Sequence, residues 1–140
     1  MSSRPLSIRF DQTLLERLRR RASGHDTTPS GLAQRLVDEG LRSQEHPGIT
    51  FRDGPSGRRA ALVAGPDVWE VVAALRYSSS RGETAVRSAA DDMNLSAGQV
   101  KTALDYYGSY PDEIDRQVAE NEQAAEEAQA AWRAQQRLLA

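Results

Sequence analysis

A short alternating segment near the N-terminus constrains the fold more than any other part of the sequence. Three apolar residues alternate there with polar ones: Leu6, Ile8 and Phe10. Alternation with a period of two predicts a strand over residues 6–10 with one apolar and one polar face. A strand this short is not stable without a partner.

Two helices are predicted directly after this strand. Leucine and alanine recur at helical spacing over residues 12–23, behind Asp11 as N-cap, and over residues 28–43, behind Thr28 and Pro29. One strand and two helices, about forty residues in all, cannot bury a sufficient core as a monomer. We therefore expect the strand to pair antiparallel with its copy in a second chain, beneath four helices.

The outer face of such a two-stranded ribbon carries Ser7 and Arg9. A ribbon of this size fits the major groove of DNA, where arginine binds a guanine edge with two hydrogen bonds and serine bonds to any base edge. The start of the second helix, at Thr28 and Ser30, has free N–H groups and the positive end of the helix dipole, which favour a phosphate. The alternative is that the ribbon only dimerises and has no DNA role.

The segments LSIRFD, LLERLRRRA and TTPSGLAQRLVDEGL resemble the ribbon-helix-helix fold of the Arc and MetJ repressors and of many bacterial antitoxins. The resemblance covers roughly residues 4–43 and implies an intertwined homodimer, with Ser7 and Arg9 reading bases in an operator and Thr28 and Ser30 holding a phosphate. Pro5 takes the outer position before Ser7, which leaves few base readers. Either the specificity is modest or Arg4 contributes to it.

Residues 45–110 are predicted to form a second domain, a β-hairpin followed by three helices. The expected elements are strands over 49–53 and 59–63 joined by a turn of four to five residues, then helices over 67–77, 83–92 and 96–107. The segments HPGITF, VAGPDVWEVV and VKTALDYYGSYPDEID resemble a small domain of bacterial antitoxins and operon proteins, in which a helix-turn-helix-like trio follows the hairpin. The last two helices either offer a face to DNA or serve as a structural spacer, and seven basic against seven acidic side chains in residues 46–110 favour the spacer.

Residues 111–140 are predicted to form one long C-terminal helix, because neither glycine nor proline occurs from 112 onward. Three basic and seven acidic side chains make this tail acidic, and its large apolar groups are candidate anchors for a partner: Trp132, Leu138 and Leu139. The likeness of the N-terminal segment extends to antitoxins of the VapB type, whose tails wrap a PIN-like ribonuclease toxin. That resemblance implies that Arg133 or Arg137 enters the acidic, metal-holding cluster of such a toxin.

Composition excludes several other classes of protein. The chain has no cysteine, which removes disulfides, thiol catalysis and cysteine-bound zinc, and its net charge of −2 excludes a uniformly basic nucleic-acid binder. No catalytic residue, metal site or cofactor motif is predicted, since neither His25 nor His46 has ligand spacing. No membrane span and no apolar signal core are found, so we expect a cytoplasmic protein.

The fold class expected is mostly α with short β: a ribbon-helix-helix dimer at residues 1–44, a hairpin with helices at 45–110 and a long helix at 111–140. The expected function is that of a non-enzymatic antitoxin that represses its own operon and neutralises a PIN-like ribonuclease. The first alternative is a stand-alone ribbon-helix-helix transcription regulator without a toxin partner, and the second is a purely structural dimer.

Overall fold

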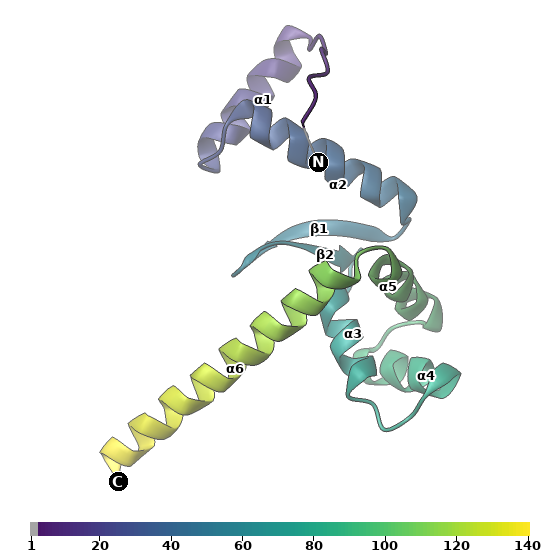
Figure 1. The fold of residues 1–140 in the computed structure, drawn as a ribbon, viewed down its shortest axis with the longest axis vertical. Helices are drawn as coiled ribbons and strands as arrows, with labels where there is room; N and C mark the ends of the chain where they lie inside the picture. Colours follow the sequence, from purple (N-terminus) through teal and green to yellow (C-terminus); the bar gives the residue numbers. More distant parts are fainter. Residues whose placement is uncertain (1–2) are drawn as a thin grey trace. The chain divides into compact units, whose positions relative to one another are not determined.

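The computed structural model describes residues 3–140, which form six helices and one two-stranded antiparallel sheet (Figure 1). The expectation of a mostly helical chain with a little β structure is therefore confirmed. The chain divides into two compact units, Met1–Leu41 and Arg42–Ala140. Helix α2 (Pro29–Glu45) contributes residues to both units, which are described separately below.

The first unit contains α1 (Gln12–Gly24) and most of α2, close to the two helices that the sequence predicts. Asp11 caps α1, because its carboxylate accepts a hydrogen bond from the Leu14 N–H at 2.9 Å. Thr28 does the same for α2, with its hydroxyl accepting from the Gly31 N–H at 3.0 Å. Only Ala22 and Leu32 are fully buried between these helices.

The strand expected over residues 6–10 is absent from the single chain. Residues 3–11 have no regular secondary structure, and the sheet of the described residues holds only the two strands of the second unit. A strand needs a neighbouring strand to supply its ladder of hydrogen bonds, and the neighbour expected for this segment belongs to another copy of the chain. The ribbon therefore stays a prediction about two copies.

The hairpin of the second unit consists of β1 (Ile49–Gly54) and β2 (Gly57–Leu62), with Ile49 opposite Leu62 and Gly54 opposite Gly57. The predicted turn of four to five residues is wrong, since only two residues separate the strands. Two glycines permit this tight connection. Gly57 takes a left-handed φ of 119°, and a Cβ on Gly54 would overlap the side chain of Arg59, which crosses that position.

Three helices follow the hairpin within one or two residues of their predicted bounds: α3 (Val68–Arg76), α4 (Gly82–Met93) and α5 (Ala97–Ser109). Asn94 ends α4 in the left-handed conformation, with φ of 55°. Ser96 and Gln99 form a capping box at the start of α5, each side chain accepting the backbone N–H of the other at 3.1 and 2.8 Å. These local signals explain why the helices could be read from the sequence.

The core of the second unit lies between the hairpin and helices α3 to α6, where α6 spans Pro111–Leu139. Its largest fully buried side chain is Tyr106 of α5. The first turns of α6 belong to this core through Ile114 and Val118, which are 0% and 2% exposed. No helix of the described residues is both long and apolar enough to cross a membrane.

Candidate functional site

The residues predicted to contact DNA lie at the surface of the first unit. Arg4, Ser7, Arg9, Thr28 and Ser30 are all exposed. The N-terminal segment and the start of α2 also share one groove of about 510 Å³. Its lining residues are Pro5, Leu6, Ile8, Phe10, Ser30, Ala33, Gln34 and Val37. Ser30, the predicted phosphate contact, thus lies on the same groove as the segment that is expected to read bases.

The start of α2 offers an anion fewer groups than the sequence suggests. The hydroxyl of Thr28 is engaged by the Gly31 N–H, and Pro29 has no N–H to donate. The N–H and the hydroxyl of Ser30 have no hydrogen-bond partner within residues 3–140. The N–H and hydroxyl of Ser30 are therefore the groups available to a phosphate, while Thr28 acts by holding the helix end in place.

Most arginines of the first unit have no carboxylate partner, although Arg35 pairs with Glu39 at 3.7 Å. Six arginines are exposed and have no ion pair in the part of the chain that the structure describes: Arg4, Arg9, Arg17, Arg19, Arg20 and Arg21. Two nearby acidic side chains serve other groups, since Asp11 caps α1 and Glu16 accepts a hydrogen bond from Gln12 at 3.5 Å. Exposed arginines without carboxylate partners are free to contact an anionic surface.

The first unit also leaves much apolar surface uncovered. We define its exposed apolar set as Leu6, Ile8, Phe10, Leu14, Leu36, Val37 and Leu41. Leu6 and Ile8 are 82% and 58% exposed, and Val37, which lies on the same groove, is 56% exposed. Leu6, Ile8, Phe10 and Val37 border the same groove, so this part of the set forms one continuous apolar surface.

In the second unit, Tyr106 holds α6 through a cluster that the sequence did not reveal. Its hydroxyl donates to Glu113 at 2.7 Å, and the Arg42 guanidinium donates to both Tyr106 and Glu113, at 2.8 and 2.9 Å. The Tyr110 ring lies 4.0 Å from the Arg42 guanidinium carbon. Burial, together with the bond to Glu113, raises the pKa of Tyr106, so its hydroxyl stays protonated.

The next residue of α5 repeats this arrangement nearer the surface. The Tyr107 hydroxyl and the Arg76 guanidinium both donate to Asp115, at 2.9 and 2.6 Å. These two hydrogen bonds, that from Arg76 first, lower the pKa of Asp115. A third tyrosine, Tyr77 at the end of α3, donates to Glu122 of α6. Paired tyrosines one turn before an acidic helix start are the only sequence signal for this arrangement.

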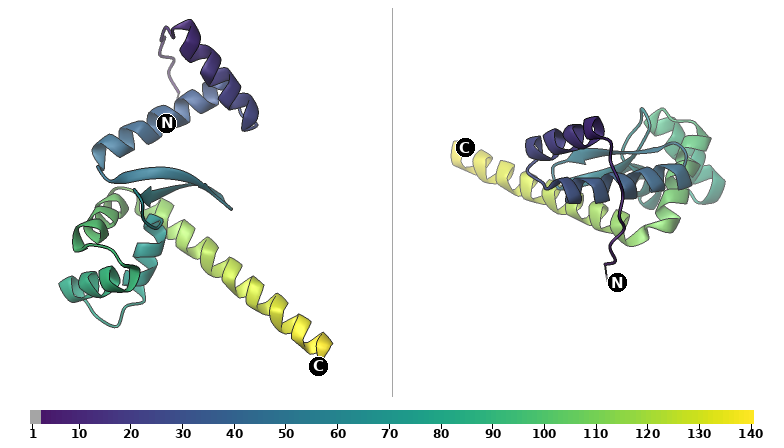
Figure 2. Two further views of the ribbon diagram at one scale, coloured as in Figure 1. Left: turned by 180° about the vertical axis from the view of Figure 1, so that it is seen from behind. Right: turned by 90° about the horizontal axis from the view of Figure 1, so that it is seen from above.

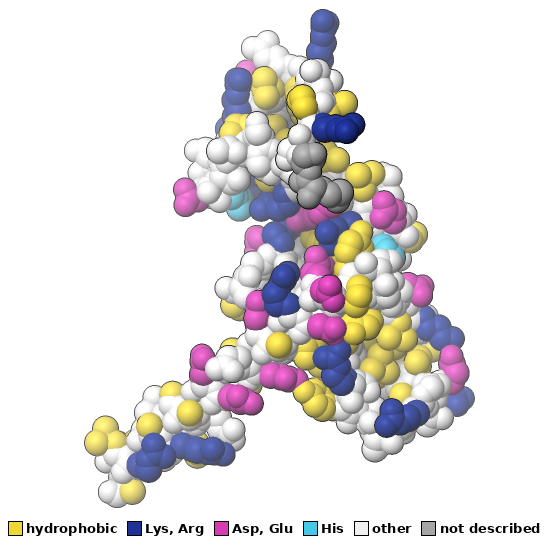
Figure 3. Space-filling model, in the orientation of Figure 1, with side chains coloured by type: hydrophobic (Ala, Val, Ile, Leu, Met, Phe, Trp, Pro, Cys, Tyr) yellow, Lys and Arg dark blue, Asp and Glu magenta, His cyan; other side chains and the backbone are white. Residues whose placement is uncertain are grey.

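Beyond Glu122, α6 extends free of its own unit. Every residue from 122 to 140 is exposed, and the views agree that this part of α6 projects past the other helices of the second unit (Figures 1 and 2). The predicted anchors lie here, with Trp132, Leu138 and Leu139 exposed by 58%, 85% and 76%. Hydrophobic and arginine side chains gather at the free end of the helix (Figure 3).

The predicted contact residues lie on three sides of α6. At 3.6 residues per turn, Trp132 and Leu139 share one side, Arg133 and Arg137 lie about a third of a turn away, and Leu138 lies about a third of a turn away in the other direction. Neither arginine forms an ion pair within the described residues. A partner that contacts all three sides must therefore enclose the helix in a groove instead of meeting it with a flat surface.

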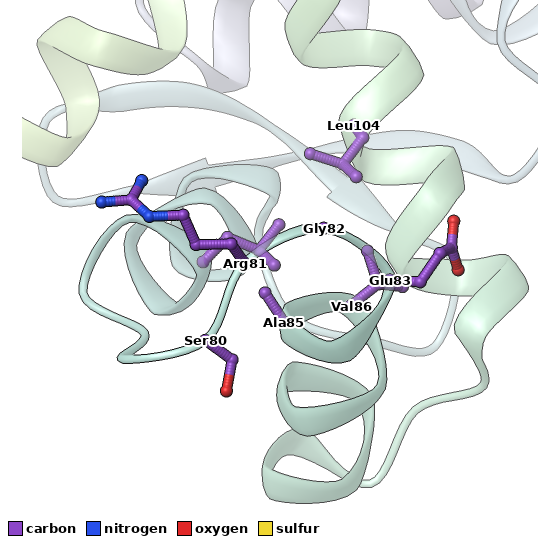
Figure 4. Close-up of a pocket in the computed structure, with 8 residues that line it drawn as sticks. Ser80, Arg81, Gly82, Glu83, Ala85, Val86 and Leu104 are labelled. Carbon is purple, nitrogen blue, oxygen red and sulfur yellow. The ribbon is translucent and has the colours of Figure 1, made fainter.

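A cavity of about 540 Å³ in the second unit lies between the start of α4 and α5. Leu104, Ala85 and Val86 give it an apolar floor, and Arg81 and Glu83 point to opposite sides of its rim (Figure 4). Glu83 is engaged by Lys101 at 3.5 Å. Lys101 of α5 is thereby paired at the surface, and Gln99 serves the capping box.

The described residues contain no group of three or more histidine or acidic side chains placed to hold a metal ion. His25 instead makes a local bond, its Nδ1 lying 2.9 Å from the Arg21 carbonyl oxygen. In comparisons with protein-family models, with curated proteins and with solved structures, this chain matches none of them.

Proposed function

We propose that this protein is a dimeric DNA-binding antitoxin that represses its own operon and neutralises a PIN-like ribonuclease through α6. The observation that carries the proposal is the exposed apolar set of the first unit beside unpaired arginines. In residues 6–10 the apolar and polar side chains alternate, so one face can enter a shared core while Ser7 and Arg9 stay outside.

A second copy of the chain is the partner that suits the exposed apolar set. Two N-terminal segments that pair antiparallel satisfy each other's backbone hydrogen bonds and cover Leu6, Ile8 and Phe10 together with the groove on α2. The same pairing brings two copies of Arg9 together on one ribbon, which fits a major groove. Ser30 adds a phosphate contact, and Arg4 extends the basic edge.

DNA binding is tested with the Arg9→Ala variant and the DNA upstream of the protein's own gene. Arginine that bonds a base edge contributes about 1–3 kcal/mol, so the variant should bind that DNA at least about fivefold more weakly. Arg87→Ala is the matched control, because it removes the same charge from a residue that is also exposed and forms no ion pair in residues 3–140. Equal affinity of the two variants would remove Arg9 from the mechanism.

The toxin-binding role rests on the exposed half of α6. Its apolar groups and two unpaired arginines suit a groove with an acidic wall, such as the metal-holding cluster of a nuclease. Co-expression with the product of the adjacent gene, followed by co-purification, tests this role. Deletion of residues 123–140 should abolish co-purification and leave DNA binding intact. A nuclease that still binds the truncated protein contradicts this role. If no nuclease co-purifies even with the full-length protein, the alternative of a stand-alone transcription regulator is favoured instead.

A further inference from the structure

One side of α1 carries two arginines and no carboxylate. Arg17 and Arg21 are four residues apart in this helix, so they lie one turn apart on the same side of it. Both are exposed, and neither forms an ion pair within residues 3–140. We propose that Arg17 and Arg21 bind neighbouring phosphates of double-stranded DNA beside the ribbon, and that they supply a part of the affinity that is independent of base sequence.

The other charged residues of α1 leave this pair without a counter-charge. The only carboxylate in the helix is that of Glu16, which is adjacent to Arg17 in sequence and therefore lies about 100° around the helix from it. Glu16 accepts a hydrogen bond from Gln12 instead, at 3.5 Å. Like charges one turn apart repel each other, so an anion that lies between Arg17 and Arg21 relieves this repulsion. No side chain of the described residues supplies that anion.

The position of Leu14 places the pair beside the proposed ribbon. Leu14 is 41% exposed and belongs to the apolar set that a second copy is proposed to cover. Arg17 and Arg21 follow it by three and seven residues, so they lie about 60° and about 20° around the helix from it. Arg19 and Arg20 follow it by five and six residues and lie about 120° or more away. When the second copy covers Leu14, Arg17 and Arg21 therefore border the ribbon.

The chemistry of the pair fits the DNA backbone. Four residues of helix rise about 6 Å, and each DNA strand carries one phosphate for about every 3.4 Å of its axis, so two guanidinium groups can contact phosphates of one strand. Arginine also binds a phosphate with two parallel hydrogen bonds. Contacts of this kind fix the position of base readers such as Arg9 and carry no sequence information themselves. The inference rests on the proposed DNA-binding role of the first unit.

The same helix supplies a matched control for a test with the full-length protein. Arg17→Ala with Arg21→Ala removes the proposed contacts, whereas Arg19→Ala with Arg20→Ala removes the same charge from other sides of α1. All four arginines are exposed, and alanine is the best helix former, so both double variants should fold. Their affinities are measured at several salt concentrations for the DNA upstream of the gene and for an unrelated duplex of equal length.

The salt dependence of binding counts the phosphate contacts. The logarithm of the affinity falls linearly with the logarithm of the salt concentration, with a slope of about −0.9 for each phosphate neutralised. A dimer that carries Arg17→Ala with Arg21→Ala loses two contacts from each chain, so its slope should be less steep by about 3 to 4 on both duplexes. The control should keep the native slope to within about 1.

Equal slopes for the two double variants would overturn the proposal and leave the DNA-binding role of the first unit standing. A native protein that binds neither duplex at low salt would overturn both. If the native protein binds the two duplexes equally and only the Arg17 and Arg21 variant loses slope, the phosphate contacts are supported and the proposed recognition of an operator by Arg9 fails.

Discussion

Tyr106 donates its hydroxyl hydrogen to Glu113 across 2.7 Å, and this bond fixes the first turn of α6 to the buried face of α5. The Arg42 guanidinium bonds both partners, so the hydroxyl of a fully buried tyrosine has both a donor and an acceptor. A buried polar group satisfied in this way stabilises a single arrangement of the helices around it. The projecting half of α6 is therefore held at its base.

The first prediction concerns the hydroxyl itself. Tyr106→Phe removes the bond to Glu113 and leaves Arg42 with one partner fewer, so the free energy of unfolding should fall by about 1–3 kcal/mol. Urea denaturation measures the change. Tyr107→Phe is the control, and its effect should be smaller because its partners Arg76 and Asp115 are more exposed. A larger loss for Tyr107→Phe would contradict this account of the cluster.

The second prediction is a loss of stability at alkaline pH. Burial and the bond to Glu113 raise the pKa of Tyr106 above its ordinary value of 10.0, so the native state keeps a proton that the unfolded state releases. The stabilisation is complete below about pH 10 and falls as pH rises above it, by up to about 1.4 kcal/mol per pH unit. Denaturation at about pH 9 and about pH 11 should show a steeper fall for the native protein than for Tyr106→Phe. If the free energy of unfolding falls equally with pH in both proteins, Tyr106 is not the source of the alkaline loss of stability.

Two truncations separate the packed half of α6 from its exposed half. Deletion of residues 123–140 removes only exposed side chains and should change the free energy of unfolding by less than about 0.5 kcal/mol. Deletion of residues 111–140 also removes Ile114 and Val118, each contributing about 1.5–3 kcal/mol through burial, and should unfold the second unit. Circular dichroism during heating distinguishes the two. A cooperative transition retained by the longer deletion would show that α6 is not part of the core.

The tight hairpin gives a fourth prediction. Gly54→Ala places a methyl group where the buried side chain of Arg59 crosses, and should cost about 1–3 kcal/mol by displacing it from Asp67 and Ser56. Gly108→Ala is the control, because a Cβ at this position in α5 meets nothing within 4 Å and should stabilise the helix by up to about 1 kcal/mol. Thermal unfolding of both variants measures the two changes in stability. Equal shifts in melting temperature would exclude the overlap with the Arg59 side chain as the cause of the loss in Gly54→Ala.

Most of the helices could be predicted because local signals mark their ends. Asp11, Asn94 and Ser96 each cap or end a helix in the structure as their residue types suggest. The hairpin was also predicted, but its turn was not, because the close passage of Arg59 over Gly54 depends on a tertiary contact. The spacing of residue types along the hairpin carries no information about such a contact.

The tyrosine cluster and the N-terminal segment were beyond prediction for different reasons. Arg42 is 64 residues from Tyr106 and 71 from Glu113 in the chain, a separation that no periodic pattern reports. The segment over residues 6–10 does show its periodicity, yet its predicted partner is the same segment of another copy. The candidate DNA contacts could be named from residue types, but only the structure shows that Thr28 is engaged as a cap and Ser30 is open.

The central claim is that two copies pair their segments over residues 6–10 antiparallel. Nuclear Overhauser contacts filtered for intermolecular pairs, in a mixture of isotope-labelled and unlabelled protein, measure this directly. The account predicts backbone contacts between Ile8 of one copy and the same region of the other, with Leu6 of one copy near Phe10 of its partner. A dimer without these contacts, or a monomer whose residues 6–10 remain unpaired, would contradict it.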